Sequence, residues 1–252
     1  MIDVLLLSVL QGIAEFLPIS SSGHLALGKM LLGMDEPGLR LDIFLHVGTL
    51  VSICVFYFSI IARIVKEGNW RYLSKIVVSA IPAGVVGVLF KDQLESAFSD
   101  STTIAVALMF TGVVLTVTRF IRNGDRGVSY YAAIMMGIAQ AIAILPGVSR
   151  SGMTISMAKL CDVEPGRSAE FSFLMSIPPI AGAALLEILN ATESAGSAVA
   201  ETSWPLVIFG GIVAALVGFF ALKFLLQSLK SNRFWLFGPY CLVMGIVTLV
   251  VG

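Results

Sequence analysis

Residues 11–24 read QGIAEFLPISSSGH, an apolar segment interrupted by a proline and three serines. Pro18 removes a helical hydrogen bond, and the serines after it favour the start of a new helix. A second apolar segment is interrupted in the same way, because residues 140–152 read QAIAILPGVSRSG. In hydrocarbon, a break between two helices is tolerated only where protein or water covers it. The two segments therefore predict re-entrant helix hairpins, at residues 4–32 and 127–160.

The two interruptions lie 128 to 129 residues apart, which is about half of the 252-residue chain. This spacing predicts two related halves, residues 1–126 and 127–252, each with one hairpin and three transmembrane helices. An odd number of crossings turns the second half upside down relative to the first. The predicted fold is thus an all-α integral membrane protein with an inverted-topology repeat, which places a site near the midplane.

Composition supports a membrane protein, since 57% of the residues are hydrophobic and 13% are charged, against about 25% charged in soluble domains. The 16 basic and 16 acidic residues balance, so no overall field attracts nucleic acid. The N-terminal segment lacks the basic start and cleavage site of a removable signal peptide, and no linker predicts a soluble domain. The cysteines Cys54, Cys161 and Cys241 form no metal-binding pattern and are interpreted as packing residues.

Uncharged stretches predict six crossings, at Leu41–Ala62, Ile76–Phe90, Ser101–Thr118, Phe171–Leu186, Thr202–Leu222 and Phe234–Gly252. The first contains Asp42 and His46, and for His46 we favour a structural role as a partner of a backbone carbonyl. Basic residues follow the first, third and fifth crossings, whereas the other loops are acidic. The positive-inside rule then places the basic loops in the cytoplasm, both termini outside and the opening of the first hairpin on the outer face.

Ionisable groups inside membrane segments are candidates for function because they are costly to bury. Gln11 and Glu15 are four residues apart on one helical face. A pair of interhelical hydrogen bonds is the structural alternative, but an amide alone would serve packing at lower desolvation cost than a carboxylate.

The first break is followed by Ser20, Ser21 and Ser22, with His24 within one turn. These serines are helix caps in the structural interpretation. A helix N-terminus also offers free N–H groups and the positive end of a dipole, which suits a phosphate. His24 is the side chain that changes protonation most easily near neutral pH.

Arg150 follows the second break directly, between Ser149 and Ser151, with Thr154 one turn further on. A guanidinium offers planar donors to a phosphate and stays charged when buried. An ion pair of Arg150 with Glu15 is the structural alternative, and such a pair is compatible with function. Together the polar groups of the two breaks predict a phosphoryl site.

These two motifs, from Gln11 to His24 and from Pro146 to Thr154, resemble those of the undecaprenyl-diphosphate phosphatase family that confers bacitracin resistance. The resemblance runs along the whole chain. It implies a bacterial inner (plasma) membrane enzyme that regenerates undecaprenyl phosphate for cell-wall synthesis with the help of a divalent cation, Mg²⁺ or Ca²⁺. Carried over by motif position, it implicates Gln11, Glu15, Ser21, His24, Arg150 and Thr154. Gln11 stands where many members have glutamate, which argues against a metal role that needs two carboxylates in this motif.

The resulting hypothesis is a membrane hydrolase that binds a polyprenyl diphosphate from the outer face. Arg150 and the amides near Ser149 and Ser21 hold the phosphates, with Ser20, Ser22 and Ser151 nearby and the cation near Glu15. Either Ser21 or a water attacks phosphorus while His24 and Glu15 relay protons. We favour Ser21, and the sequence leaves open whether the chain forms a homodimer.

Two rival functions remain. A lipid flippase or secondary transporter also uses inverted repeats with broken helices at the midplane. A structural membrane subunit is the weaker alternative, since it would not need Glu15, His24 and Arg150 in membrane-buried segments.

Overall fold

A computed structural model describes residues 1–33, 39–98, 100–193 and 203–251 of the chain. Within these residues the chain is helical, and the only strand-like feature is an isolated bridge between Arg126 and Val163. In chain order the helices are α1 (Ile2–Ala14), α2 (Ser21–Leu31), α3 (Leu39–Phe56), α4 (Phe58–Lys66), α5 (Trp70–Leu89), α6 (Lys91–Phe98), α7 (Ser101–Val117), η1 (Thr118–Phe120), α8 (Tyr130–Ile142), α9 (Arg150–Leu160), α10 (Pro165–Glu193), α11 (Trp204–Lys230), η2 (Phe234–Leu236) and α12 (Phe237–Val251).

In the described part of the chain, five helices are long and apolar enough to cross a membrane: α5, α7 with η1, α10, α11, and α12 with η2. A sixth candidate is the bent pair of α3 and α4. These elements coincide with the six predicted crossings, although Thr202 and Gly252 lie outside the described residues. The chain is therefore a multi-pass helical membrane protein.

The first predicted crossing, Leu41–Ala62, was wrong as a single helix. The chain bends by 68° at Tyr57, between α3 and α4. Neither proline nor glycine marks this bend. Instead the Tyr57 side chain is buried and its ring stacks on Phe173 of α10, while the turn brings Ile64 of α4 into the same core. Tertiary packing rather than a local breaker ends α3.

The acidic segment Asp92–Asp100 was predicted as a loop, but most of it forms α6. Asp100 then starts α7, because its carboxylate accepts hydrogen bonds from the backbone N–H groups of Thr102 and Thr103 at 3.2 and 3.1 Å. This is a side-chain cap of the next helix.

The two predicted hairpins are present as helix pairs, α1 with α2 and α8 with α9. In both, the first helix ends four residues before the proline: α1 at Ala14 before Pro18, and α8 at Ile142 before Pro146. A proline ring clashes with the carbonyl of the residue four positions earlier, which explains both ends.

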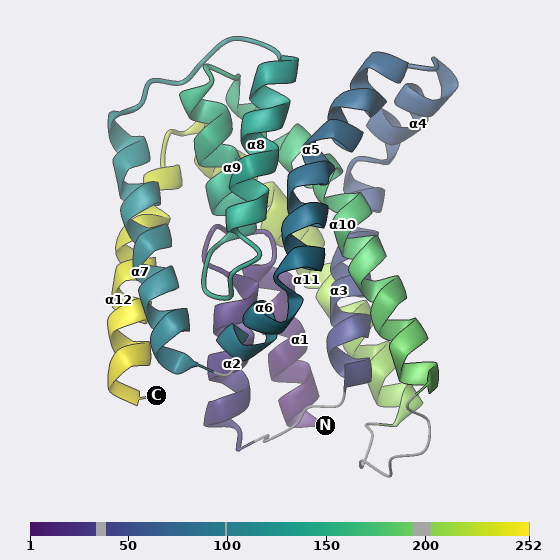
Figure 1. The fold of residues 1–252 in the computed structure, drawn as a ribbon, viewed down its shortest axis with the longest axis vertical. Coiled ribbons are helices and arrows are strands. Elements are labelled where there is room, and N and C mark those ends of the chain that lie inside the picture. The colour runs from purple at the N-terminus through teal and green to yellow at the C-terminus, as the bar shows by residue number, and fades with distance from the viewer. Residues whose placement is uncertain (34–38, 99, 194–202, 252) are drawn as a thin grey trace.

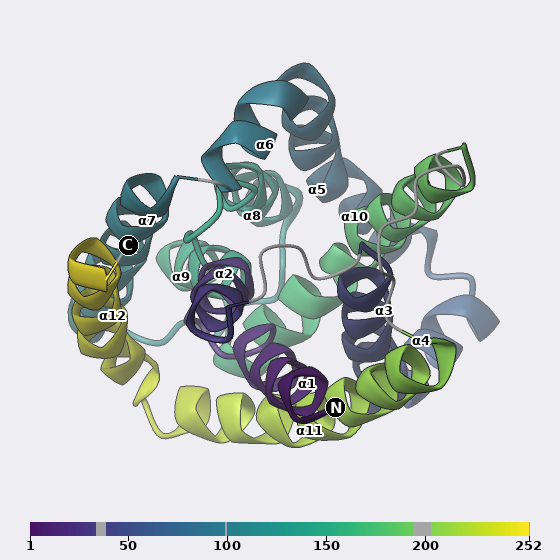
Figure 2. The same cartoon turned by 90° about the horizontal axis from the view of Figure 1, so that it is seen from below.

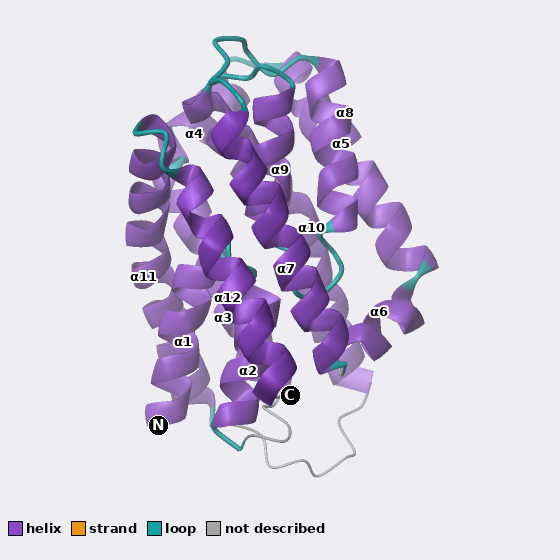
Figure 3. Cartoon of the chain, turned by 90° about the vertical axis from the view of Figure 1, so that its left-hand side faces the viewer, coloured by secondary structure: helices purple, strands orange, loops and turns teal. Residues whose placement is uncertain are grey.

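The hairpins occupy opposite ends of the molecule and approach each other in its middle (Figure 1). Each hairpin packs on a long helix from the other part of the chain. Helix α1 contacts α11, and α8 contacts α5. The pair of α7 and α12 closes one side of the bundle and α3 with α10 the other, as the view along the bundle shows (Figure 2). The side view shows that helices make up nearly all of the described chain (Figure 3).

The basic loops lie together at one end. The α4 region and the connection from α7 to α8 are at the end opposite the N-terminus of α1 and the C-terminus of α12 (Figure 1). The third basic loop, which connects α11 to η2, lies at the same end, because the guanidinium of Arg119 in η1 lies 4.6 Å from the ring of Trp235 in η2. Charge is thus segregated along the long axis of the molecule.

Candidate active site

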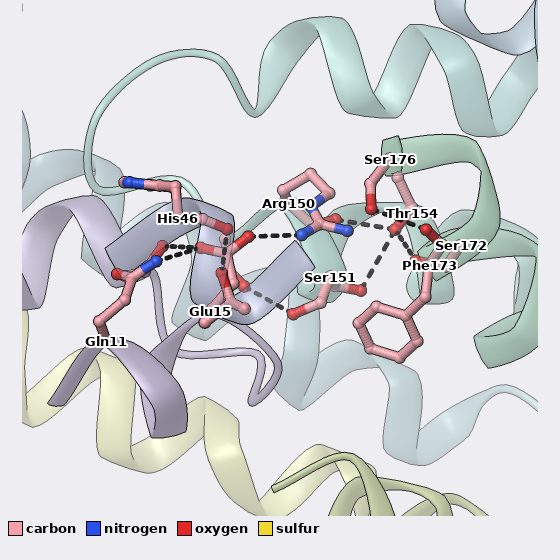
Figure 4. Close-up of polar contacts among 12 residues, drawn as sticks. Gln11, Glu15, His46, Arg150, Ser151, Thr154, Ser172, Phe173 and Ser176 are labelled. Atoms are coloured by element: carbon pink, nitrogen blue, oxygen red, sulfur yellow. Dashed lines mark hydrogen bonds and ion pairs between the residues drawn. The ribbon is translucent and has the colours of Figure 1, made fainter. Parts of the chain in front are cut away.

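An ion pair joins the two hairpins where their breaks meet. Arg150 Nη2 donates to Glu15 Oε1 at 2.6 Å (Figure 4), and the side chains are 15% and 7% exposed. Glu15 follows the last residue of α1, whereas Arg150 is the first residue of α9. The alternative pairing considered from the sequence is therefore real, and it holds the two opposite charges together at the centre of the molecule.

The second carboxylate oxygen of Glu15 accepts two further hydrogen bonds. Ser21 Oγ donates to Glu15 Oε2 at 2.8 Å, and Gln11 Nε2 donates to the same oxygen at 3.2 Å. The carboxylate is thereby fixed between a guanidinium, a hydroxyl and an amide. The other end of the amide, Gln11 Oε1, is buried and has no hydrogen-bond partner among the described residues.

Two serines cap the inner helices in the same way. Ser20 Oγ accepts from the N–H of Gly23 at 3.3 Å, and Ser149 Oγ accepts from the N–H of Gly152 at 3.1 Å. Ser20 also adopts a positive φ of 70°, which is rare for a residue with a side chain. Both serines therefore serve at least as helix caps.

Two other serines connect the breaks to each other. Ser22 Oγ accepts from the N–H of Gly147 at 3.3 Å, and Ser151 Oγ donates to the carbonyl of Leu17, also at 3.3 Å. Each hairpin thus contributes one hydroxyl to the backbone of the opposite break. These contacts bring Ser20, Ser22, Ser149 and Ser151 to the site, with their hydroxyls already used within the protein.

The structure pairs His24 with a residue that the sequence did not suggest. His24 Nδ1 lies 2.9 Å from the carbonyl of Ser20 and must donate to it, so in the neutral ring Nε2 is an acceptor. That nitrogen lies 2.8 Å from the hydroxyl of Tyr240 on α12. Among the described residues Ser21 and His24 form no hydrogen bond with each other, because the His24 ring is turned toward Tyr240 and the Ser21 hydroxyl toward Glu15.

Arg150 retains a free donor. Its Nη1 atom is buried without a hydrogen-bond partner among the described residues, although its guanidinium lies 5.8 Å from the ring of Phe173. Thr154 does not supply that partner. Its hydroxyl donates to the Arg150 carbonyl at 2.8 Å and lies 2.6 Å from Ser172 Oγ on α10, so it positions the start of α9 (Figure 4).

The structural hydrogen bond predicted for His46 is confirmed, since its Nδ1 lies 2.9 Å from the Asp42 carbonyl. The side chain lies beside Gln11 and Glu15 (Figure 4). Helix α3 thus brings His46 to the site, although the sequence interpretation had given this residue only a structural role.

Tyr240, Ser172 and His46 are the site neighbours that sequence reasoning missed or set aside. They lie on α12, α10 and α3, far along the chain from the two breaks. A tyrosine and a serine in apolar helices give no local signal of function, so only the packing of the bundle identifies them.

Comparison with known proteins assigns the family. The family model for bacitracin resistance protein BacA matches residues 4–247. A curated relative from Halothermothrix orenii, named undecaprenyl-diphosphatase, is 37% identical over 254 residues, covering 98% of this chain and 96% of the relative. Another of the same name from Thermotoga petrophila is 38% identical over 251 residues, covering 98% and 99%. The chain therefore belongs to the bacitracin resistance protein BacA family, as the two serine-rich breaks predicted.

Proposed function

We propose that the chain hydrolyses undecaprenyl diphosphate to undecaprenyl phosphate and inorganic phosphate where the two breaks meet. This reaction recycles the carrier lipid for cell-wall synthesis and accounts for bacitracin resistance. The observation that carries the assignment of the site is the Arg150 guanidinium, which Glu15 holds through one nitrogen while Nη1 stays buried without a partner among the described residues. A planar guanidinium suits a phosphate.

Backbone donors reinforce this anion site from both hairpins. Gly23 in the first turn of α2 lies against Gly147, and Gly152 in the first turn of α9 lies against Pro18. The N-terminal ends of α2 and α9 therefore approach the same centre from opposite sides, and both direct the positive end of their dipoles toward it.

Ser21 is the proposed nucleophile and Glu15 its base. As Ser21 Oγ forms a bond to the terminal phosphorus, its proton passes to Glu15 Oε2, 2.8 Å away, and the bond from phosphorus to the bridging oxygen breaks. Undecaprenyl phosphate leaves with the electrons of that bond. Water then attacks the phosphoserine, inorganic phosphate departs, and the proton on Glu15 returns to Ser21.

The pair of His24 and Tyr240 is assigned to the second step. His24 lies one turn after Ser21 in α2, and its acceptor nitrogen already receives the Tyr240 hydroxyl. We assign to this pair the proton released when water attacks the phosphoserine. The tyrosine hydroxyl fixes the ring orientation in which Nε2 is the base.

A divalent cation fits this site only together with the substrate. No group of three histidine, cysteine or acidic side chains could hold a metal in the described part of the chain. Glu15 and the unpartnered Gln11 Oε1 offer two oxygens, and Mg²⁺ is commonly held by one or two carboxylates plus phosphate oxygens. When bound, the cation would offset the negative charge of the phosphates. The Glu15–Arg150 pair alone has no net charge with which to do so.

We also propose that the two halves form an inverted-topology repeat, residues 1–126 and 127–252, with re-entrant hairpins. The matched hairpin lengths, the paired serine caps and the exchange of α11 and α5 as neighbours support it. In the orientation proposed here, the basic end faces the cytoplasm, both described termini face outward and the diphosphate enters from the outer, periplasmic face of the inner membrane.

Phosphate release by protein purified in detergent micelles separates hydrolysis from transport, because micelles have no two sides to transport between. The wild type should release inorganic phosphate, Arg150→Ala should lose at least about 99% of that rate, and the matched control Arg122→Ala should keep it. No release by folded wild type would favour the flippase or transporter. Equal loss in both arginine variants would remove Arg150 from the site.

Thiol labelling of intact cells tests the orientation, in a background without the native cysteines. Gln93→Cys, on exposed α6, should react with an impermeant reagent, and Asn123→Cys, in the exposed loop after η1, should react only after lysis. The reverse pattern would place the first hairpin on the cytoplasmic side.

A further inference from the structure

Away from the active site, α3 and α11 form a close pair that runs as far as the bend at Tyr57. The pair is in backbone contact at Gly48 and Gly211, where an added Cβ on Gly48 would clash with the Gly211 carbonyl. Two hollows lie along this pair, one apolar and one basic.

The apolar hollow is a slot of about 200 Å³. The slot forms because Gly48 and Gly211 allow the backbones of α3 and α11 to come into contact, while larger side chains stand on either side of the two glycines. Val51 and Ile212, two of these side chains, are 47% and 56% exposed. The lining residues are Phe44, Val47, Gly48, Val51, Ile208, Gly211, Ile212 and Ala215.

The basic hollow has a volume of about 540 Å³ and lies at the end of the same pair. Lys223 and Lys230 line it on α11, with Phe56 from the end of α3. Neither ammonium group forms an ion pair with a carboxylate among the described residues, and Lys223 Nζ lies instead 4.7 Å from the ring of Phe219. The polar groups Gln227 and Ser231 complete the lining with Leu226.

The two hollows share one face of α11. Residues 212 and 223 are eleven positions apart, as are residues 215 and 226, and eleven residues make about three helical turns. Between the midpoints of the α11 residues that line them, 208–215 and 223–231, the slot lies roughly 23 Å from the hollow along the helix. The 68° bend directs α4 away from this line, so α3 ends at Phe56 while α11 continues to Lys230.

We propose that this groove binds an anionic glycerophospholipid from the leaflet next to the basic loops. Its phosphate would rest between Lys223 and Lys230, and an acyl chain would follow the exposed α3–α11 face to the slot. Two unpaired ammonium groups with no carboxylate in the lining favour a net negative headgroup over a zwitterionic one. The spacing between hollow and slot fits one lipid that spans from headgroup to acyl chain.

This lipid would brace the helix that supports the first hairpin. The opposite side of α11 carries α1 and the first break, because Gly12 of α1 lies against Val217 and Phe16 of the break lies against Gly218. Binding on the outer side of α11 would thus stabilise the packing of the first break without touching the reacting groups.

Native mass spectrometry of the purified full chain tests the proposal, with phosphatidylglycerol, phosphatidylcholine, a prenyl phosphate and inorganic phosphate as separate probes. Phosphatidylglycerol should be retained preferentially, and Lys223→Gln with Lys230→Gln should weaken that retention roughly tenfold or more. The control Arg63→Gln with Lys66→Gln removes two charges from neighbouring α4, outside the lining, and should retain the lipid. Val51→Trp, which fills the slot and keeps both lysines, should also weaken retention.

Phosphatidylglycerol should raise the thermal unfolding temperature of the wild type and of the α4 control, but not of the lysine variant. Undiminished retention by the lysine variant would overturn the proposal, as would equal retention of phosphatidylcholine. Stronger retention of the prenyl phosphate would assign the groove to the reaction product instead, and retention of inorganic phosphate alone would leave an ion site without a lipid.

Discussion

The first and second breaks are built alike but carry different chemistry. In each, a helix of 13 residues ends four residues before a proline, a serine caps the next helix, and that helix has 11 residues. At the position after the cap, the first break has Ser21 and the second has Arg150. Aligned on the caps, Ile144 stands opposite Glu15 and Met153 opposite His24. The duplicated geometry thus places two helix N-termini at one centre, and in the proposed mechanism the residues that differ assign attack to the first break and phosphate binding to the second.

Removal of the attacking group should have the largest effect. Ser21→Ala leaves Glu15 and Arg150 in place but removes the proposed nucleophile, so turnover should fall roughly 1000-fold or more. Ser22→Ala removes the 3.3 Å hydrogen bond from the Gly147 N–H and the 3.2 Å contact with Ser20 Oγ, and it should slow the reaction several-fold. The measurement is kcat for phosphate release. More than about a tenth of wild-type turnover in Ser21→Ala, a change under roughly 1.4 kcal/mol, would leave an activated water as the nucleophile.

Exchange of the binding group comes next. Arg150→Lys keeps the charge but loses the planar fork that contacts Glu15 and is proposed to bind phosphate, so turnover should fall about 100-fold or more, or roughly 3 kcal/mol. Arg122→Lys, at an exposed position, is the matched control. Near wild-type activity in Arg150→Lys would mean that Arg150 acts only as a positive charge or as a structural partner. The proposal that the second break binds phosphate through a planar guanidinium would then be wrong.

The backbone of the second break offers a test of stability. Gly147 has a φ of 92°, and an added Cβ there would clash with the Ile104 carbonyl. Gly147→Ala should therefore destabilise the protein by roughly 1–3 kcal/mol, measured by thermal unfolding in detergent. Gly84→Ala is the control, because nothing lies within 4 Å of its added Cβ. Equal thermal unfolding temperatures for the two variants would mean that the second break accommodates a side chain at position 147.

The smallest expected effect concerns the tyrosine partner of His24. Tyr240→Phe removes one hydrogen bond of 2.8 Å and keeps the ring that stacks on the imidazole at 5.6 Å. Loss of about 0.5–1.5 kcal/mol should lower kcat roughly 2- to 13-fold with little change in KM. Tyr131→Phe, on an exposed side chain of α8, serves as control. An unchanged kcat would remove Tyr240 from the proton path.

Much of the fold could be predicted because its signals are local. Pro18 and Pro146 are each followed by a capping serine, and the predicted interruptions of the two helical segments lie there. Proline alone was not sufficient, since Pro82 in α5 and the pair Pro178 and Pro179 in α10 lie inside continuous helices. The combination of a helix breaker with a new cap is what identified the breaks.

The parts that escaped prediction depend on contacts between distant segments. The bend at Tyr57 follows from packing on Phe173, which no window around residue 57 contains. The pairing of His24 with Tyr240 spans 216 positions along the chain. Of the residues that the sequence singled out in the first hairpin, Gln11 and Ser21 contact Glu15, whereas His24 faces Tyr240, and these partners depend on how the helices of the bundle pack.

The stereochemical course at the terminal phosphorus tests the division between an attacking and a binding break most directly. Each in-line displacement inverts configuration at phosphorus. Attack by Ser21 followed by water makes two inversions. A substrate whose terminal phosphorus carries sulfur and two different oxygen isotopes, hydrolysed in water of the third isotope, should therefore give chiral inorganic thiophosphate with net retention. Direct attack by water makes one, and net inversion would contradict the account.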